Sequence, residues 1–268
     1  MSQPDPKVKS WPVLLTPGGG RANVGAVNRF RIPRIESIAG LACLFTGRAE
    51  EPRPDPARLL PMLGHALPAP RHLAIARQIH SNVCLIVCKS DIPQGEGVHL
   101  AGEGDALVTR ERNLALGVAT ADCLSLLAVD PQAGVLAVVH AGWRGTLAGV
   151  FESAIAVMRG SFGADTARIV IGAGPAAGPC CYEVGVEVRE AFMRARPNDC
   201  EGIFTPTSNG RARLDLFAAN RLQAIAAGVP DRQIVSAGVC TICRPELTHS
   251  FRRDGQAAGR MCLLGALY

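Results

Sequence analysis

The chain has 268 residues, of which 48% are apolar and 19% charged, a composition that excludes a disordered protein and allows one large domain or two small ones. No run of apolar residues approaches the roughly 18 needed to span a membrane, and residues 1–12 lack the hydrophobic core of a signal peptide. We therefore expect a cytoplasmic protein with no membrane partner. Aromatic residues make up only 4% of the chain, which argues against a base-stacking surface for nucleic acid.

The net charge of +5 is concentrated at the start of the chain. Residues 1–35 carry six basic side chains against Asp5 alone and are rich in Pro and Gly, whereas the remainder is neutral. We therefore expect a loosely ordered basic leader over 1–35, a single catalytic domain over 36–268, and no nucleic-acid partner.

The hydrophobic pattern predicts alternating strands and helices along the chain. Asp215 is a good N-cap for one of the helices, which Gly228 and Pro230 would end. The predicted elements are, in chain order, a helix within 55–67, strands at 83–87, 114–119, 124–129 and 135–139, a helix at 145–159, a strand at 168–171, helices at 183–194 and 215–227, and a strand at 233–239. Because 124–129 and 135–139 form an evident hairpin, at least part of the sheet is antiparallel, which favours an α+β fold.

The ten cysteines are expected to be reduced thiols, because the chain shows no sign of secretion. Cys240-x-x-Cys243 is a lone CxxC without a second pair at zinc-ribbon spacing, so by itself it is a weak metal signal. Cys180 and Cys181 are adjacent, and no site follows from them alone.

The hairpin brings a thiol close to an imidazole. If Val129 opposes Val135, Leu124 opposes His140 and Cys123 is one position away. A shift of one residue would make Cys123 face His140 directly. A thiolate beside an imidazole is either a nucleophile–base pair or two ligands of one metal.

A third ligand candidate is His80, at the entry to the predicted strand 83–87. Two histidines and one cysteine with one open coordination position are typical of catalytic zinc. Spacing alone does not choose between such a metal site and a Cys123–His140 hydrolase pair.

The chain resembles a known family in an ordered set of motifs between Leu73 and Met261. The motifs are Gln78-Ile79-His80, Gly104-Asp105-Ala106, Thr120-Ala121-Asp122-Cys123, His140-Ala141-Gly142-Trp143-Arg144-Gly145, Gly174-Pro175-Ala176, Cys181-Tyr182-Glu183-Val184-Gly185, Asp215-Leu216, Arg252-Arg253-Asp254-Gly255 and Gly259-Arg260-Met261. They resemble the family once named multicopper polyphenol oxidoreductases, or laccase-domain proteins, whose members are also described as zinc-dependent purine nucleoside phosphorylases with adenosine deaminase activity.

The resemblance implies a fold, a metal site and a reaction. The fold would be a layered α+β structure of mixed and antiparallel sheets flanked by helices, related to cysteine-hydrolase-like toxins. His80, Cys123 and His140 would bind the metal, which would be zinc, or alternatively copper. The partners would be a purine nucleoside and phosphate.

Five further residues are candidates for the site. We assign Asp122 to catalysis, because it could orient an imidazole or bind substrate, although it could equally close a turn. Four arginines are candidates for binding the substrate, since their guanidinium groups could hold phosphate or ribose hydroxyls: Arg48, Arg144, Arg252 and Arg253. Arg48 belongs to the only N-terminal segment that resembles the family, Phe45-Thr46-Gly47-Arg48.

Two other activities remain as alternatives. A copper-dependent polyphenol oxidase is disfavoured, because an enzyme with several coppers needs many histidines and this chain has six, none in a His-x-His pair. A cysteine hydrolase that uses Cys123 and His140 on peptides or cell-wall precursors would, unlike a zinc enzyme, survive metal removal.

Overall fold

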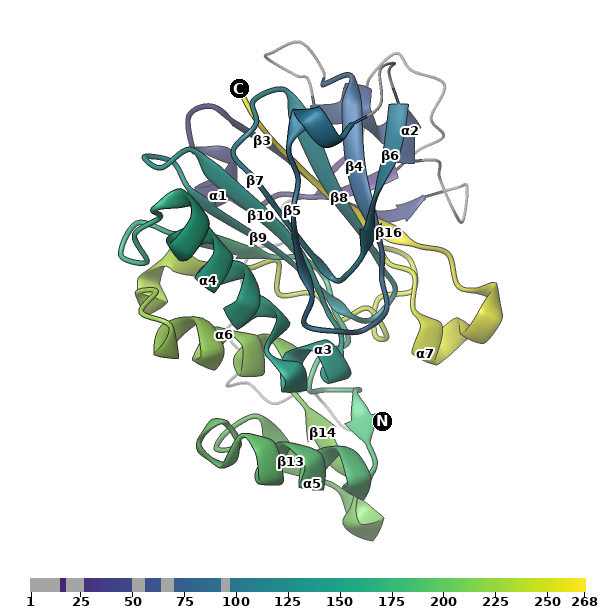
Figure 1. Ribbon diagram of the computed structural model, residues 1–268. Coiled ribbons are helices and arrows are strands. Elements are labelled where there is room, and N and C mark those ends of the chain that lie inside the picture. The colour runs from purple at the N-terminus through teal and green to yellow at the C-terminus, as the bar shows by residue number, and fades with distance from the viewer. Residues whose placement is uncertain (1–14, 18–26, 50–55, 64–69, 93–96) are drawn as a thin grey trace.

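Two β-sheets packed face to face form the centre of the molecule (Figure 1). The computed structural model describes residues 15–17, 27–49, 56–63, 70–92 and 97–268. The first sheet has seven strands, in the order β1 (Leu15–Pro17), β2 (Val27–Phe30), β3 (Leu41–Ala49), β16 (Met261–Leu267), β8 (Leu114–Thr120), β4 (His72–Arg77) and β6 (Gly97–Glu103). The second has six, in the order β15 (Ile234–Ser236), β11 (Val170–Ala173), β9 (Leu124–Asp130), β10 (Val135–Ala141), β7 (Ala106–Thr109) and β5 (Cys84–Ile86).

The apolar side chains of β9 and β10 are buried on both faces of their sheet. Leu127 and Val138 face the first sheet and join its core, whereas Leu126 and Val139 face the helices on the other side. Both strands are therefore apolar at nearly every position, as expected for strands buried on both faces.

Helices cover the two outer faces of the sandwich. The helices α4 (Val150–Phe162) and α6 (Leu216–Ala226) pack on the second sheet (Figure 1). On the outer face of the first sheet, α2 (Pro56–Leu59) and the 3₁₀ turn Leu60–Leu63 bury their leucines. The remaining helices are α1 (Pro33–Glu36), α3 (Trp143–Ala148), α5 (Val186–Ala195) and α7 (Phe251–Asp254).

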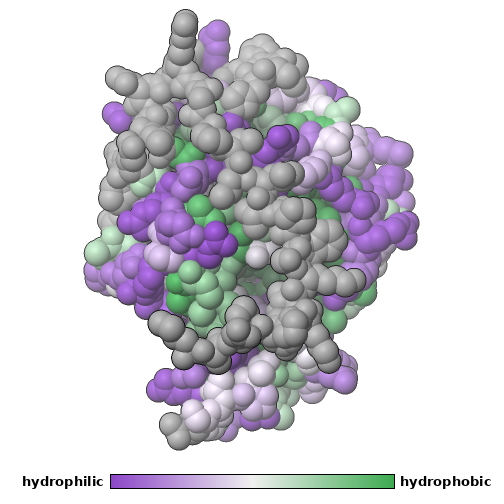
Figure 2. All heavy atoms as spheres, turned by 180° about the vertical axis from the view of Figure 1, so that it is seen from behind, coloured by the Kyte–Doolittle hydropathy of each residue, from purple (hydrophilic) through white to green (hydrophobic). Residues whose placement is uncertain are grey.

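A small lobe projects from the second sheet. It consists of α5 and a three-stranded sheet in the order β12 (Glu183–Val184), β14 (Ala212–Leu214), β13 (Phe204–Pro206). The lobe lies at the bottom of both overall views, and its surface is purple to white over most of its area, that is, hydrophilic to intermediate (Figures 1 and 2).

The predicted fold class is confirmed: mixed sheets are layered between helices. Both sheets contain parallel pairs, β4 with β6 and β8 in the first and β11 with β15 and β5 with β7 in the second, and the other pairs are antiparallel. Within the part of the chain that the structure describes, no helix is both long and apolar enough to cross a membrane.

Several predicted helices differ from the observed ones. The helix expected at 145–159 is two helices, because Gly149 adopts φ +82° and ends α3 before α4 begins. Of the helix expected at 183–194, the first two residues are strand β12 and α5 begins at Val186. The one expected within 55–67 is helical only over Pro56–Leu63, and 64–69 lie outside the described residues.

One strand in the later half of the chain is shorter than expected, and the strand expected at 168–171 lies two residues later, at Val170–Ala173. The strand predicted at 233–239 covers only Ile234–Ser236 in β15, after a 3₁₀ turn over Asp231–Gln233. The predicted N-cap is confirmed, because the Asp215 carboxylate accepts a hydrogen bond from the Ala218 amide at 2.9 Å.

The expected loose leader needs correction from residue 27 onward. Strand β2 pairs with β3, and Phe30, Ile32 and Ile35 are buried in the core between the sheets. These apolar side chains contribute to the fold, so the packed part of the chain begins before residue 36. Residues 1–14 and 18–26 of the expected leader lie outside the described residues.

Candidate functional site

Three side chains from separate segments meet at one end of the β9–β10 hairpin. His80 lies in the loop after β4, Cys123 directly precedes β9, and His140 is near the end of β10. Their ligand atoms all lie within 4.8 Å of one another, with Cys123 Sγ 3.9 Å from His80 Nε2. The two imidazole rings are edge to face, with centroids 4.9 Å apart. The structure thus brings together the three residues that the sequence analysis grouped.

The hairpin register differs from both registers considered. His140 pairs with Ser125 and Ala141 with Leu124, so Cys123 is one residue beyond the last pair. Cys123 therefore does not face His140 across the ladder. It reaches the imidazole from the turn at Asp122, which adopts φ +91°.

The buried carboxylate of Asp105 holds the two histidines in place. It is fully buried, lies 2.8 Å (Oδ1) from His140 Nδ1, and accepts hydrogen bonds from the amides of Ile79, His80 and Ser81. Since Nδ1 is engaged, Nε2 is the ring nitrogen of His140 that remains for a metal or a thiol. A carboxylate behind a ligating imidazole is a common means of fixing its orientation and basicity.

The charges of these groups are coupled. Burial by itself would raise the pKa of Asp105, but hydrogen bonds from His140 and Ser81 outweigh it and lower this pKa to about 2. Burial likewise opposes ionisation of Cys123, yet the two imidazoles lower its pKa to about 6. Burial would keep His140 neutral, but Asp105 and Cys123 raise its pKa to about 9. Without a metal, the pair is therefore a thiolate beside an imidazolium at neutral pH.

Asp105 was not among the residues that the sequence analysis assigned to the site. It stands in the motif Gly104-Asp105-Ala106, directly before an apolar strand. An acidic residue at such a position could have identified it, because a buried carboxylate without a partner would be costly.

Asp122 has a different set of partners from those expected of an imidazole-orienting group. Its carboxylate accepts hydrogen bonds from the Thr241 hydroxyl at 2.5 Å and the Arg252 amide at 2.6 Å, and its carbonyl accepts one from the Ala177 amide. It connects the turn before Cys123 to two distant loops, and the carboxylate that contacts His140 is that of Asp105.

Gly142 leaves room for the cluster. A Cβ at this position would lie 2.9 Å from Cys123 Sγ and 3.1 Å from His80 Cδ2. Because a side chain here would press on two of the three candidate ligands, the glycine is required for close approach rather than for its backbone angles.

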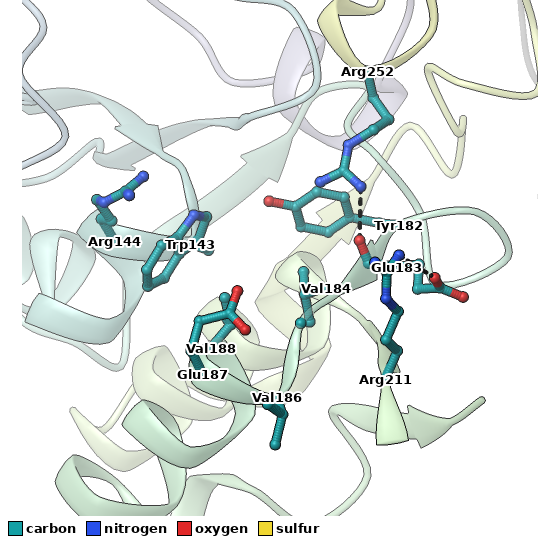
Figure 3. A pocket seen from close by; sticks show the side chains of 11 residues that line it. Trp143, Arg144, Tyr182, Glu183, Val184, Val186, Glu187, Val188, Arg211 and Arg252 are labelled. Atoms are coloured by element: carbon teal, nitrogen blue, oxygen red, sulfur yellow. Dashed lines mark hydrogen bonds and ion pairs between the residues drawn. The ribbon is translucent and has the colours of Figure 1, made fainter. Parts of the chain in front are cut away.

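A pocket of about 490 Å³ lies beside the cluster. Trp143 and Arg144 lie across it from Tyr182 and Arg252, and the Glu187 carboxylate points into the space between them (Figure 3). Trp143 and Arg144 directly follow Gly142, which lies against Cys123, so this wall of the pocket is next to the cluster. Burial, and then the charge of the Cys123 thiolate, raises the pKa of Tyr182 to about 12.

Of the three arginines that line the pocket, Arg144, Arg211 and Arg252, the first and the last lie over aromatic rings. The guanidinium carbon of Arg144 is 4.3 Å from the centroid of Trp143, and that of Arg252 is 5.1 Å from Tyr182. Arg252 also donates to the Glu183 carbonyl at 2.7 Å. Cation–π contacts of this kind hold the guanidinium groups in defined positions.

The other two candidate arginines are not in the lining of this pocket. Arg253 donates to the carbonyls of Thr241 and Thr248 and pairs with both carboxylate oxygens of Asp254. Its donors are thus used to hold the loop that follows β15. Arg48 is exposed and donates to the Pro245 carbonyl at 3.2 Å.

The donor set at the cluster fits a metal ion. One thiolate and two imidazoles are the ligand types of catalytic zinc, which keeps a fourth position open. The low pKa of Cys123, the orientation of His140 by Asp105 and the space left by Gly142 all suit three groups converging on one ion.

Comparisons with known proteins agree with this geometry. The family described as multi-copper polyphenol oxidoreductase laccase matches residues 58–267. Adenosine deaminase RL5, from an unknown prokaryotic organism, is 40% identical over 193 residues, which cover 70% of this chain and 72% of that protein. A purine nucleoside phosphorylase of Xylella fastidiosa (strain 9a5c) is 33% identical over 264 residues, 96% of this chain and 95% of that protein.

Solved structures share the fold over nearly the whole chain. The crystal structure of YlmD from Geobacillus stearothermophilus superposes with a TM-score of 0.79 at 28% identity, covering 96% of this chain and 99% of that one. The Bacillus licheniformis protein YfiH gives the same TM-score at 26% identity, covering 92% and 98%. The chain therefore belongs to the multi-copper polyphenol oxidoreductase laccase family.

Proposed function

We propose that the protein is a purine nucleoside phosphorylase, with adenosine deaminase as a further activity, whose reaction centre is the cluster of His80, Cys123 and His140. The observation that carries the proposal is the position of this cluster next to a pocket whose lining includes three arginines and two aromatic rings. Relatives named purine nucleoside phosphorylase and adenosine deaminase support the same substrate class.

The three side chains would hold a zinc ion. When bound, zinc with an open position supplies a Lewis acid that polarises an oxygen or lowers the pKa of water to about 7. Copper is the alternative metal, since two imidazoles and one thiolate also form copper sites. We favour zinc, because the chain has six histidines in total, too few for several copper centres.

The aromatic rings and the arginines have separate roles in the proposed reaction. Trp143 and Tyr182 offer flat apolar faces to a purine ring. Arg144 and Arg252 would bind phosphate and neutralise its charge as it attacks the anomeric carbon and the base leaves. Glu187, which points into the pocket, is placed to accept hydrogen bonds from ribose hydroxyls.

The chain's own acid–base groups orient the site. Asp105 holds the ring of His140 through Nδ1, so that Nε2 faces the cluster. Asp122 keeps Cys123 at its place in the turn through its bonds to Thr241 and Arg252. We also propose a cytoplasmic location, because none of the ten cysteines, all of which lie among the described residues, forms a disulfide, as expected in a reducing compartment.

The test is turnover of adenosine and inosine by the zinc-loaded protein, with and without phosphate. We expect free purine base and ribose 1-phosphate only when phosphate is present, and loss of activity with a chelator. Base release that is equally fast without phosphate would replace phosphorolysis by hydrolysis, and release of ammonia from adenosine would report deamination separately.

A cysteine hydrolase is the second candidate, because one specific observation favours it. The low pKa of Cys123 and the high pKa of His140 describe the thiolate–imidazolium pair of a nucleophilic cysteine. Such an enzyme would cleave amides after complete metal removal and would be inactivated by a thiol reagent. Amide cleavage that persists in chelator, without nucleoside turnover, would select it.

A further inference from the structure

Four cysteines from two distant segments meet at one place outside the cluster described above. They are the neighbours Cys180 and Cys181 and the pair Cys240 and Cys243. All four sulfur atoms lie within 4.8 Å of one another. Cys243 Sγ is 3.4 Å from Cys180 Sγ and 3.0 Å from Cys181 Sγ. We call this group the four-cysteine cluster.

The backbone around the cluster is arranged to receive negative charge on sulfur. The Gly178 amide donates to Cys240 Sγ at 3.3 Å. The amide N–H groups of Ile242 and Cys243 also favour the ionised form of this sulfur. Hydrogen bonds from amides stabilise a thiolate, which is the form that binds a metal.

The two segments are fixed relative to each other by main-chain contacts. The Thr241 amide donates to the Ala176 carbonyl at 2.9 Å, and the Ala176 amide to the Val239 carbonyl at 3.2 Å. A Cβ on Gly178 would lie 3.1 Å from Cys240 Cβ, so the segments are in close contact there. The sulfur atoms therefore converge because the backbone holds them, and each thiol comes from a segment with a defined conformation.

The arrangement suits one tetrahedral ion better than disulfides. With Zn–S bonds of about 2.3 Å, four sulfurs around one zinc ion lie about 3.8 Å apart. The four cysteine sulfurs are all within 4.8 Å of one another, which is compatible with this spacing. Two separate disulfides would need each sulfur to have one exclusive partner, whereas Cys243 is close to both Cys180 and Cys181.

From this geometry we infer a second metal site, in which Cys180, Cys181, Cys240 and Cys243 bind a zinc ion as four thiolates. The set is complete with four sulfurs, so the site is closed and structural rather than catalytic. Binding exchanges the thiol protons for the ion and releases them to the solvent, with no change of oxidation state. It shares no ligand with the cluster of His80, Cys123 and His140, and so does not depend on the proposed function.

The four-cysteine cluster is connected to the substrate pocket and to the turn before Cys123. Thr241, between the two cysteines of the second pair, donates to Asp122 beside Cys123. Tyr182, which follows Cys181, lines the substrate pocket. An ion that joins the two segments would therefore fix one wall of the pocket and the turn before Cys123.

The first test uses the unaltered full-length protein, purified under reducing conditions. We expect about two zinc ions per chain, one for each group of ligands. Without a chelator, five thiols, the four of this cluster and Cys123, should resist a thiol reagent, and they should react once the zinc is removed. Cobalt, substituted for zinc, should give the intense thiolate-to-metal bands of a four-sulfur site.

Variants assign the two ions. Cys240→Ser should lose one zinc and the four-sulfur cobalt bands while keeping the other zinc, and Cys123→Ser should do the converse. Cys200→Ser is the matched control, because this partly buried thiol belongs to neither group, and it should keep both. The proposal is wrong if Cys123→Ser removes all zinc. It is equally wrong if the reduced, unaltered protein contains a disulfide between these cysteines in place of metal.

Discussion

Asp105 Oδ1 lies 2.8 Å from His140 Nδ1, and both side chains are buried. The same carboxylate accepts hydrogen bonds from the amides of His80 and Ser81, so Asp105 positions two of the three candidate ligands, His80 and His140. Asp105 directly precedes strand β7, which pairs with β10, and its carboxylate thereby connects the loop of His80 to β10.

Asp105→Asn should weaken metal binding at the cluster. The amide cannot act as a charged acceptor for the imidazole N–H, and replacing such a partner typically lowers metal affinity roughly 10- to 100-fold. Competition with a chromophoric chelator measures the affinity. Asp231→Asn is the control, since it removes only an exposed ion pair with Arg221 and should leave the affinity unchanged. Equal affinities in all three proteins would contradict the role given to Asp105.

Asp105 should also make the metal-free protein sensitive to acid. Its folded-state pKa of about 2 is below the ordinary value of 3.8, so the ionised form stabilises the fold above pH about 4, and this contribution is lost as the pH falls toward 2. The shift corresponds to about 2 kcal/mol. Urea unfolding from pH 7 to 2.5 should show the difference between wild type and Asp105→Asn shrinking in acid. A difference that is constant over this range would rule out the linkage.

Gly142→Ala should disturb the cluster without unfolding the protein. The new methyl would lie 2.9 Å from Cys123 Sγ and 3.1 Å from His80 Cδ2, so one of the two ligands must move. We expect roughly a 10-fold or larger loss of zinc affinity, as for other changes that misplace ligands. Gly160→Ala is the matched control, because it meets nothing within 4 Å in helix α4 and should slightly stabilise the protein. Unchanged zinc affinity in Gly142→Ala would show that the cluster accommodates the methyl group without displacing a ligand.

Phe30→Ala should destabilise the whole domain. The side chain is 3% exposed and packs in the core between the two sheets, so its removal should cost about 3–5 kcal/mol in the free energy of unfolding. Leu100→Ala, at a residue that is 65% exposed, should change stability by about 0.5 kcal/mol or less. Chemical denaturation measures both. A small effect of Phe30→Ala would restore the expectation of a loosely ordered leader up to residue 35.

Arg144→Gln should weaken the use of phosphate and leave zinc in place. Loss of a hydrogen bond to a charged group costs about 1.5–3 kcal/mol, which corresponds to a roughly 10- to 100-fold higher KM for phosphate. Arg221→Gln, a cation outside the pocket lining, is the control. If phosphate saturation were the same in both variants, phosphate would have to bind elsewhere.

Local sequence determined several features of this protein. The hairpin β9–β10, the nearness of Cys123 to His140 and the N-cap at Asp215 followed from apolar runs, a turn and a capping residue within short stretches of chain. These features depend on neighbouring residues, whose hydrogen bonds and side-chain spacing are fixed by local geometry. The ordered motifs likewise identified the family.

Only the tertiary structure decided which distant residues share a site. The observed register, with His140 opposite Ser125, differs by one residue from the first register considered and by two from the one in which Cys123 faces His140, since register depends on how the whole strand is buried. Spacing did not indicate that Asp105 would lie behind His140, or that Cys180 and Cys181 would meet Cys243. These contacts join segments that are separated by tens of residues, and they form because the two sheets and their loops pack together, which no local pattern of residues specifies.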